Sequence, residues 1–190
     1  MLFYFISRAN REIKNINSGG KNIICFGDSI TFGYGVNPGE DYPASLAKLV
    51  RIPVINAGVD GDTSAQGLKR LQADVLDKAP YLVLVEFSGN DLIKGVAIAD
   101  TVNNIKEMIQ RIQAKGAMVA VVDVSAGLFM LEYRLRFFQL ARETGAIFIP
   151  AVLDRILTNP GMKSDFMHPN ARGYKIVAQR VYRGISKYLK

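Results

Sequence analysis

Five short segments of the chain are apolar almost throughout, and segments with helical spacing separate them. A strand that is buried on both faces of a sheet has such a continuous apolar run, whereas a strand with one wet face alternates. Helices between the runs would supply the crossovers that parallel strands need. The apolar runs are residues 22–26, 53–56, 81–87, 117–124 and 146–149.

The helices are predicted from the spacing of apolar residues and from end signals. Thr63 and Gln66 form a capping-box pattern, which opens a helix that continues to about residue 78. An apolar stripe over 102–112 predicts another helix, which the basic residue and glycine at 115–116 would end. Further helices are predicted over 42–51, over about 130–144, and from Pro169, as the first helical position, to the C-terminus.

This alternation predicts an α/β fold, a three-layer α/β/α domain over residues 22–190 with a five-stranded parallel sheet of the flavodoxin-like kind. Functional sites in such sheets lie at the carboxyl ends of the strands. The loops to inspect are therefore 27–41, 57–63, 88–97, 125–129 and 150–168.

Residues 1–21 form a separate N-terminal extension. Leu2, Ile6, Ala9, Ile13 and Ile16 recur at helical spacing, which predicts a short helix packed on the domain. The alternative is the remainder of a longer membrane anchor. The first residues are a poor signal peptide, since they lack a basic start and a cleavage site. Residues 18–20 are predicted to be a flexible joint, and the compartment is left open.

Composition narrows the possible chemistry. With 190 residues the chain has room for one domain, and its single Cys excludes an intrachain disulfide and every multi-Cys zinc site. Cys25 lies in the first apolar run and is expected to be a core residue. The single His excludes metal motifs that need a His pair. Any imidazole chemistry must therefore come from His168.

The net charge of +7 is concentrated at the two ends of the chain. Residues 163–190 hold seven basic residues and one acid. We expect a solvated basic face on the last helix, and attraction to anionic lipid headgroups is the alternative. Nucleic-acid binding is disfavoured because no aromatic residues interleave with the basic ones. The basic arc is Arg172, Lys175, Arg180, Arg183, Lys187 and Lys190, opposite Tyr174, Val177, Val181, Ile185, Tyr188 and Leu189. The oligomeric state is left open.

Ser29 and the pair Asp165 and His168 are candidates for nucleophilic catalysis. Ser29 follows the first strand by two residues, and His168 lies in the loop after the fifth, just before Pro169. A Ser nucleophile needs a base, and the base needs an acid that holds its tautomer. The alternatives are a turn-forming Ser29 and a structural His beside a fortuitous Asp. A metal site is less favoured, because a metal usually needs three or more ligands.

Gly61 and Asn90 are candidate oxyanion donors. They follow the second and third strands, so they reach the same sheet edge as Ser29. Fixed donors at a developing oxyanion are often the largest catalytic term. Both positions also fit ordinary turns.

Four blocks of the sequence together resemble the SGNH (GDSL) hydrolase family. They are FGDSIT at 26–31, the segment from NAG at 56–58 through GDTS at 61–64 to RL at 70–71, GND at 89–91, and DFMHPN at 165–170. Their order and spacing match across residues 22–190. The second block is similar to the branch of bacterial thioesterases, lysophospholipases and arylesterases.

The resemblance implies a serine ester hydrolase with roles for the same residues. Ser29 would be the nucleophile, His168 the base and Asp165 its orienter. The oxyanion hole would be the backbone N–H groups of Ser29 and Gly61 with the Asn90 side chain. No metal or organic cofactor is implied, and the partner is a small acyl ester or thioester: a lysophospholipid, acyl-CoA, or a short aryl or alkyl ester. A carbohydrate O-acetyl esterase and a non-catalytic lipid-binding module are the alternatives.

Two polar residues and one apolar group raise further structural questions. Ser88 stands where the family pattern has Gly, and it would strain the loop if that position needs a positive φ. Glu86 lies in an apolar strand and needs a buried partner that the sequence does not identify. The apolar residues beside the loop after the fourth strand are expected in the core rather than in an acyl-chain groove; they are Phe129, Met130, Leu131, Phe137 and Phe138.

Overall fold

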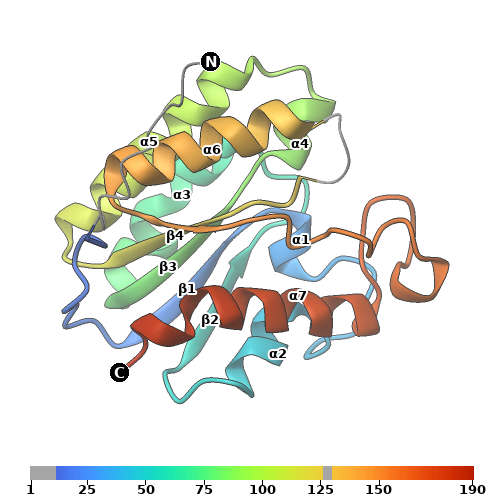
Figure 1. Ribbon diagram of the computed structural model, residues 1–190, viewed down its shortest axis with the longest axis horizontal. Coiled ribbons are helices and arrows are strands. Elements are labelled where there is room, and N and C mark those ends of the chain that lie inside the picture. The colour runs from blue at the N-terminus through green and yellow to red at the C-terminus, as the bar shows by residue number, and fades with distance from the viewer. Residues whose placement is uncertain (1–11, 126–129) are drawn as a thin grey trace, which may run out of the picture.

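The computed structural model describes residues 12–125 and 130–190. Five strands form one parallel sheet in the order β2-β1-β3-β4-β5 (Figure 1). The chain runs from β1 to β2 on one side and then crosses to β3 on the other, so the switch point lies between β1 and β3. This confirms the predicted fold class. The strands are β1 (Asn22–Gly27), β2 (Val54–Gly58), β3 (Pro80–Glu86), β4 (Met118–Val122) and β5 (Ile147–Ile149).

Helices cover both faces of the sheet and give the three predicted layers (Figure 1). One face carries α3 (Ser64–Asp74), α5 (Ile98–Ala114) and α6 (Leu131–Thr144); the other carries α2 (Tyr42–Ala47) and α7 (Ala171–Ile185). Two short helices, α1 (Ser29–Phe32) and α4 (Gly89–Ile93), follow β1 and β3 directly, at the switch point. The remaining turns are η1 (Leu76–Lys78), η3 (Pro160–Met162) and η4 (Ser186–Tyr188).

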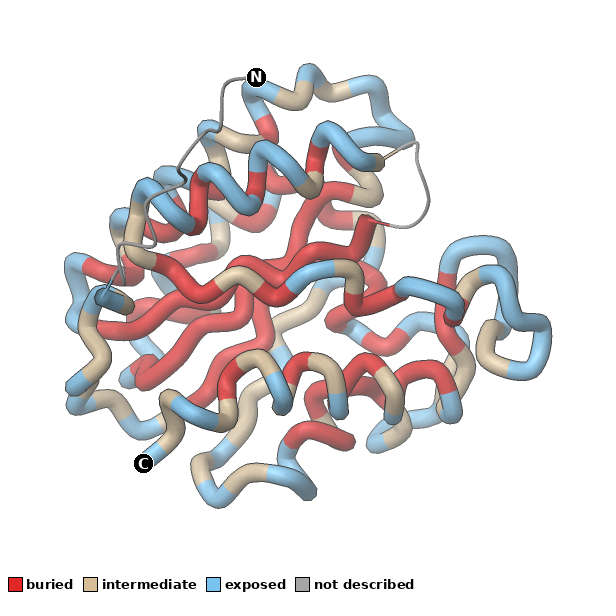
Figure 2. The backbone as a smooth tube through the Cα atoms, in the orientation of Figure 1, coloured by how far each residue is buried: buried red, intermediate tan, exposed pale blue. Residues whose placement is uncertain are grey.

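The core consists of two apolar layers separated by the sheet, and the central strands β3 and β4 are buried along their length (Figure 2). Successive residues of β3 alternate between the layers. Leu82 and Leu84 pack in the layer with Val177 of α7, whereas Val83 packs in the layer with Ile109 of α5. Each such strand therefore needs apolar side chains on both of its faces, which is why continuous apolar runs in the sequence predicted the strands.

The structure corrects four predicted ends of three helices. The last helix begins at Ala171, since the Asn170 side chain accepts hydrogen bonds from the N–H groups of Arg172 and Gly173. It ends at Ile185 and a 3-10 turn follows. The helix over 42–51 ends at Ala47, and the helix that the confirmed capping box of Thr63 opens ends at Asp74.

Residues 12–21 pack on the domain without forming a helix, so the helical spacing was misleading over this part; the rest of that prediction lies outside the described residues. Residues 14–17 form a turn, and Ile13 and Ile16 pack against the core. The Asn15 side chain donates to the carbonyl groups of Gln113 and Ala117. Gly20 lies against the backbone of Pro80 with no room for a Cβ, so the predicted joint is a packed contact there.

The apolar residues near the loop after β4 divide into two groups. Phe137 is a core residue, as predicted, and Met130 is partly buried. Leu131 and Phe138 are 43% and 45% exposed, so the core prediction was wrong for them. Phe129 lies outside the described residues. Cys25 is fully buried, and this burial raises the pKa of its thiol, as expected for a core residue.

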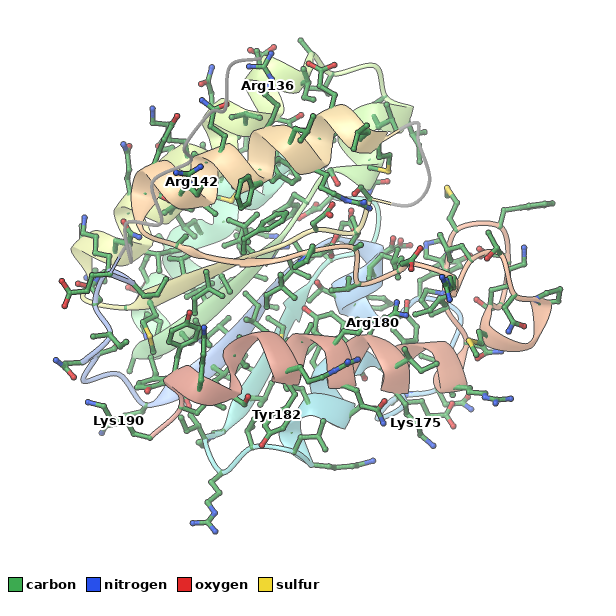
Figure 3. The ribbon with its side chains drawn as sticks, in the orientation of Figure 1. Arg136, Arg142, Lys175, Arg180, Tyr182 and Lys190 are labelled. Carbon is green, nitrogen blue, oxygen red and sulfur yellow. The ribbon has the colours of Figure 1, made fainter. Side chains whose placement is uncertain are left out.

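The last helix has the predicted two-faced pattern. Val177, Val181 and Ile185 are fully buried, whereas Lys175 and Lys190 are exposed at the surface (Figure 3). Arg180 is partly buried and donates to the carbonyl groups of Val152 and Asp154. Within the described part of the chain, no helix is long and apolar enough to cross a membrane.

Candidate active site

Ser29 is the first residue of α1, directly after the turn that follows β1. The Asp28 side chain caps α1 by accepting from the Ile30 N–H at 3.0 Å. Gly33, at φ 93°, ends the helix after one turn. The turn holds the Ser29 hydroxyl at the carboxyl edge of the sheet, where its residue is only 8% exposed. The nearly buried hydroxyl is therefore shielded from water, but side chains of the neighbouring loop can contact it.

Asp165 and His168 form a compact loop before α7. The Asp165 carboxylate contacts His168 Nδ1 at 2.8 Å and accepts from the backbone N–H groups of Met167 and His168. Burial acts to raise the pKa of Asp165, but these hydrogen bonds outweigh it and hold the pKa below its usual value. The ring of Tyr34 lies 4.5 Å from the His168 ring, centroid to centroid. The imidazole is therefore fixed from two sides.

The second ring nitrogen of His168 reaches Ser29. Nε2 lies 3.0 Å from Ser29 Oγ. Carboxylate, imidazole and hydroxyl therefore lie in one hydrogen-bonded row, which is the arrangement needed for a base-activated serine nucleophile.

Asn90 lies beside this row, at the start of α4. Its Nδ2 atom is 3.0 Å from the Asp62 carbonyl oxygen and 3.3 Å from Asp28 Oδ2. Ser88 precedes this helix with φ 178°, an extended conformation open to any residue, so the strain considered for a serine at this position is not present. Asp91 anchors α4 by accepting from the backbone and side chain of Ser64 and from Thr101.

Gly61 connects to the site less directly. It has φ 78°, which favours glycine, and its Cα faces open space. Its neighbour Asp62 supplies the carbonyl that Asn90 contacts. Gly61 does not line the cavity beside Ser29, and its own carbonyl accepts from Lys94.

An apolar cavity of about 160 Å³ opens beside Ser29, Asn90 and His168. Its walls come from four loops at the carboxyl edge of the sheet. The apolar lining residues are Ile30, Leu92, Ile93, Val124, Met130, Leu153, Leu157 and Met167. Such a lining suits a hydrocarbon chain, with the polar groups at one end of it.

The sequence profile of the GDSL-like lipase/acylhydrolase family matches residues 25–176, which span the site and most of the sheet. The chain belongs to this family. It is accordingly a hydrolase of esters with small-molecule substrates. Esterase TesA of Pseudomonas aeruginosa is 30% identical over 163 residues, which are 80% of this chain and 81% of the relative. Thioesterase 1/protease 1/lysophospholipase L1 of Escherichia coli strain K12 is 29% identical over 82% of this chain and 79% of its own length.

Solved structures of GDSL hydrolases share the fold. A crystal structure of TesA superposes with a TM-score of 0.83 at 28% identity, covering 88% of this chain and 99% of that one. The SGNH-hydrolase family esterase AlinE4 superposes with a TM-score of 0.69 at 31% identity, covering 90% and 97%.

In this GDSL hydrolase, Arg70 is a site residue to which the sequence analysis gave no role. Its guanidinium donates to the carbonyl oxygens of Gly27 and Ala57 and to Asp62, and it lies over the Phe26 ring at 4.5 Å. It thereby ties the end of β1, just before Ser29, to the loop that contacts Asn90. The family resemblance includes Arg70, but the sequence does not identify its partners, because two of them are backbone carbonyls and Asp62 lies in a separate loop.

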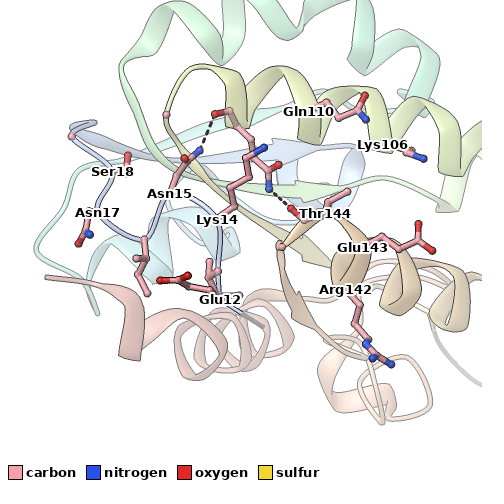
Figure 4. Close-up of a pocket in the computed structure, with 16 residues that line it drawn as sticks. Glu12, Lys14, Asn15, Asn17, Ser18, Lys106, Gln110, Arg142, Glu143 and Thr144 are labelled. Carbon is pink, nitrogen blue, oxygen red and sulfur yellow. Dashed lines mark hydrogen bonds between the residues drawn. The ribbon is translucent and has the colours of Figure 1, made fainter. Parts of the chain in front are cut away.

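A larger, polar groove lies at the opposite edge of the sheet (Figure 4). Residues 12–19 and the C-terminal ends of α5 and α6 line it, and Asn15, Gln113 and Thr144 connect its walls by hydrogen bonds. None of the predicted site residues lines this groove. Among residues 12–125 and 130–190, no group of three or more His, Cys, Asp or Glu side chains could hold a metal ion.

Proposed function

We propose that the protein hydrolyses acyl esters or thioesters through a covalent acyl-enzyme on Ser29, with His168 as the base and Asp165 as its orienter. The observation that carries this proposal is the row of contacts from Asp165 through His168 to Ser29 Oγ, which ends at the apolar cavity.

The reaction takes place in two symmetrical halves. His168 Nε2 accepts the Ser29 proton as Oγ bonds to the acyl carbon and the carbonyl electron pair moves onto oxygen. The tetrahedral intermediate collapses, its bond to the leaving oxygen or sulfur breaks, and His168 protonates the leaving group. Water then attacks the acyl-enzyme while His168 takes its proton. Ser29 Oγ leaves with that proton and the free acid is released. These steps need no metal or organic cofactor.

We assign the oxyanion to the Ser29 N–H, the Gly61 N–H and the Asn90 amide. Asn90 supports this most directly because it lines the cavity beside Ser29. Its Nδ2 atom contacts both the Asp62 carbonyl oxygen and Asp28 Oδ2, which hold the amide beside Ser29. Gly61 would contribute through the loop that it shares with Asp62.

The cavity favours an aliphatic acyl group. A hydrocarbon chain gains about 0.8 kcal/mol for each buried CH₂ group, whereas an acetylated sugar would place hydroxyl groups against an apolar wall. Lysophospholipids, acyl-CoA and short aryl or alkyl esters all present an acyl chain. Neither the relatives nor the cavity favours a carbohydrate O-acetyl esterase or a non-catalytic binding module.

Labelling with a fluorophosphonate tests the nucleophile, because this probe phosphonylates an activated serine with loss of fluoride. We expect wild type and the control Ser45→Ala to be labelled and active, and Ser29→Ala to be neither. Ser45 is a buried serine on α2 that does not line the cavity. A labelled or fully active Ser29→Ala variant would disprove the assignment.

A series of rates over acyl chain length tests the substrate class, with acyl-CoA, lysophospholipid and an acetylated sugar alongside. We expect kcat/KM to rise beyond two carbons as the chain fills the cavity. A sharp optimum at acetyl, with high rates on the acetylated sugar, would instead favour the carbohydrate esterase.

Contact of the basic face of α7 with anionic membranes stays a prediction. It is supported by the exposure of Arg172, Lys175 and Arg183 on α7 and of Lys187 and Lys190 just after it. Flotation with anionic vesicles, compared with neutral ones, would test it.

A further inference from the structure

Glu86 is a fully buried acid directly beneath the nucleophile turn. It ends β3, and its Oε2 atom accepts from Thr31 Oγ1 at 2.8 Å and from the Asp28 N–H at 3.4 Å. Its Oε1 atom has no hydrogen-bond partner among the described residues. A charged carboxylate with one bare oxygen would be far more costly there than a neutral acid.

The groups that donate to Glu86, and the phenols next to them, are neutral. The Tyr42 hydroxyl of α2 lies 3.3 Å from Thr31 Oγ1, and burial raises the pKa of Tyr42 and of Tyr174 of α7, with the Glu86 charge as a further cause. Both phenols are therefore protonated. Burial and the nearby Asp28 raise the pKa of Glu86 well above its usual value. Among the described residues no basic group acts on the Glu86 carboxyl, so it retains its proton.

Asp28 is buried as well, but both of its side-chain oxygens accept hydrogen bonds. It accepts from the Ile30 N–H at 3.0 Å and from Asn90 Nδ2 at 3.3 Å, which favours the charged form. Burial raises its pKa to about 6; the Ile30 N–H, Glu86 and the positive charge of His168 act to lower it, and the charge of Asp91 acts to raise it. Two neighbouring carboxyls that share one proton divide into one acid and one carboxylate. The proton therefore belongs to Glu86 and the charge to Asp28.

We propose that Glu86 is a positioning residue of the hydrolysis: as a neutral acid it accepts from the Asp28 N–H and the Thr31 hydroxyl and so holds the turn at Asp28 in place, and through Asp28 it orients the Asn90 amide. This rests on the proposed function, in which Asn90 serves the oxyanion. The connection runs from Thr31 through Glu86 and Asp28 to Asn90, so β3 supports the oxyanion site from below.

Two replacements of Glu86 separate this role from packing. Glu86→Gln keeps a neutral donor of the same shape, whereas Glu86→Met keeps the volume but removes every polar atom. For both variants, kcat and KM are measured against pH on a short soluble ester. Their stability is measured by unfolding in urea. Gln113→Met, in a buried position of α5 remote from Ser29, is the matched control.

We expect Glu86→Gln to retain kcat within about threefold, and Glu86→Met to lose at least about tenfold in kcat with little change in KM, short of the ~10²–10³-fold expected when an oxyanion donor is removed. Because Glu86 lowers the pKa of Asp28, Glu86→Met moves the acid limb of the rate to higher pH and Glu86→Gln does not. The urea midpoint of Glu86→Met is expected to fall, because the buried Asp28 N–H and Thr31 hydroxyl lose their acceptor.

Several results would overturn the proposal. A wild-type kcat and acid limb in Glu86→Met would leave Glu86 only a packing role. A Glu86→Gln variant as slow as one lacking Asn90 would mean that Glu86 acts as a charge. Should Glu86→Met not fold, infrared difference spectroscopy decides: a protonated-carboxyl band at neutral pH that is absent in Glu86→Gln supports the proposal, and its absence from wild type overturns it. Loss of activity in Ser29→Ala is independent of all these outcomes.

Discussion

His168 Nε2 lies 3.0 Å from Ser29 Oγ, although 139 positions separate the two residues in the sequence. The contact joins the turn after β1 to the loop before α7, so the folded sheet holds the imidazole and the hydroxyl together before any substrate arrives. Such preorganisation replaces a bimolecular encounter by a fixed geometry. His168 is the only histidine, so no other imidazole could substitute for it.

Asp165→Asn should disable the base without removing it. The asparagine NH2 group can donate to Nδ1, so the ring loses its preferred tautomer, and a neutral amide does not stabilise the imidazolium as a carboxylate does. We expect kcat to fall by about 10²–10⁴-fold, as for an orienting Asp in a Ser-His-Asp triad. Steady-state kinetics on a soluble ester would measure this. Asp154→Asn, an exposed acid in the same loop region, should be unaffected; equal losses in both variants would contradict the role of Asp165.

Asn90→Ala should slow the chemistry and leave ground-state binding almost unchanged. Removing one oxyanion donor is expected to lower kcat by about 10²–10³-fold with a small change in KM. The control is Asn37→Ala, because Asn37 is exposed and its side chain contacts only Glu40 among the described residues. A rise in KM at constant kcat would show that Asn90 binds substrate and transition state equally well.

The sequence predicted the sheet and the row from Asp165 to Ser29 because these depend on patterns within short segments. Apolar runs such as 81–87 must be buried on both faces, and the position of Ser29 after one such run fixes its sheet edge. The spacing of Asp165 and His168 already allows one to hold the other. In each case the information is local, and the parallel topology brings the segments together.

The contacts that support the site could not be predicted because they join backbone atoms across distant loops. Arg70 and Glu86 have partners such as the Gly27 carbonyl and the Asp28 N–H, which no residue type encodes. Helical spacing misled at Ile13 and Ile16 for a related reason. These residues pack on the core from a turn, and tertiary contacts such as those of Asn15 determine its course.

Filling the cavity should shorten the preferred acyl chain. Leu157 lines the cavity and is partly buried, so Leu157→Trp would occupy space that a longer chain needs. We expect kcat/KM for longer acyl esters to fall by roughly 10–200-fold, the range for misfit of about one methylene, while acetyl ester hydrolysis changes little. The control is Leu135→Trp, because Leu135 of α6 is 59% exposed. A uniform loss across all chain lengths would mean that the cavity does not hold the acyl group.

Arg134→Met should destabilise the fold by leaving a buried carboxylate unpaired. Asp123 is fully buried and accepts from Arg134 Nε at 2.9 Å and from the N–H groups of Ser125 and Ala151. This cluster connects the ends of β4 and β5, beside the cavity residues Val124 and Leu153. Removal of one partner from a buried ion pair costs about 3–5 kcal/mol, and the partial exposure of Arg134 places this case at the lower end.

A double-mutant cycle in urea separates the pair from the packing of each residue. We expect Asp123→Asn in the Arg134→Met background to restore part of the lost free energy of unfolding, because the neutral amide leaves no buried charge to compensate. The exposed pair of Arg136 and Glu132 is the matched control, and Arg136→Met should change stability by less than about 1 kcal/mol. If Arg134→Met and Arg136→Met were equally mild, hydrogen bonds from Ser125 and Ala151 alone would satisfy Asp123. The position of the cavity wall would then not depend on Arg134.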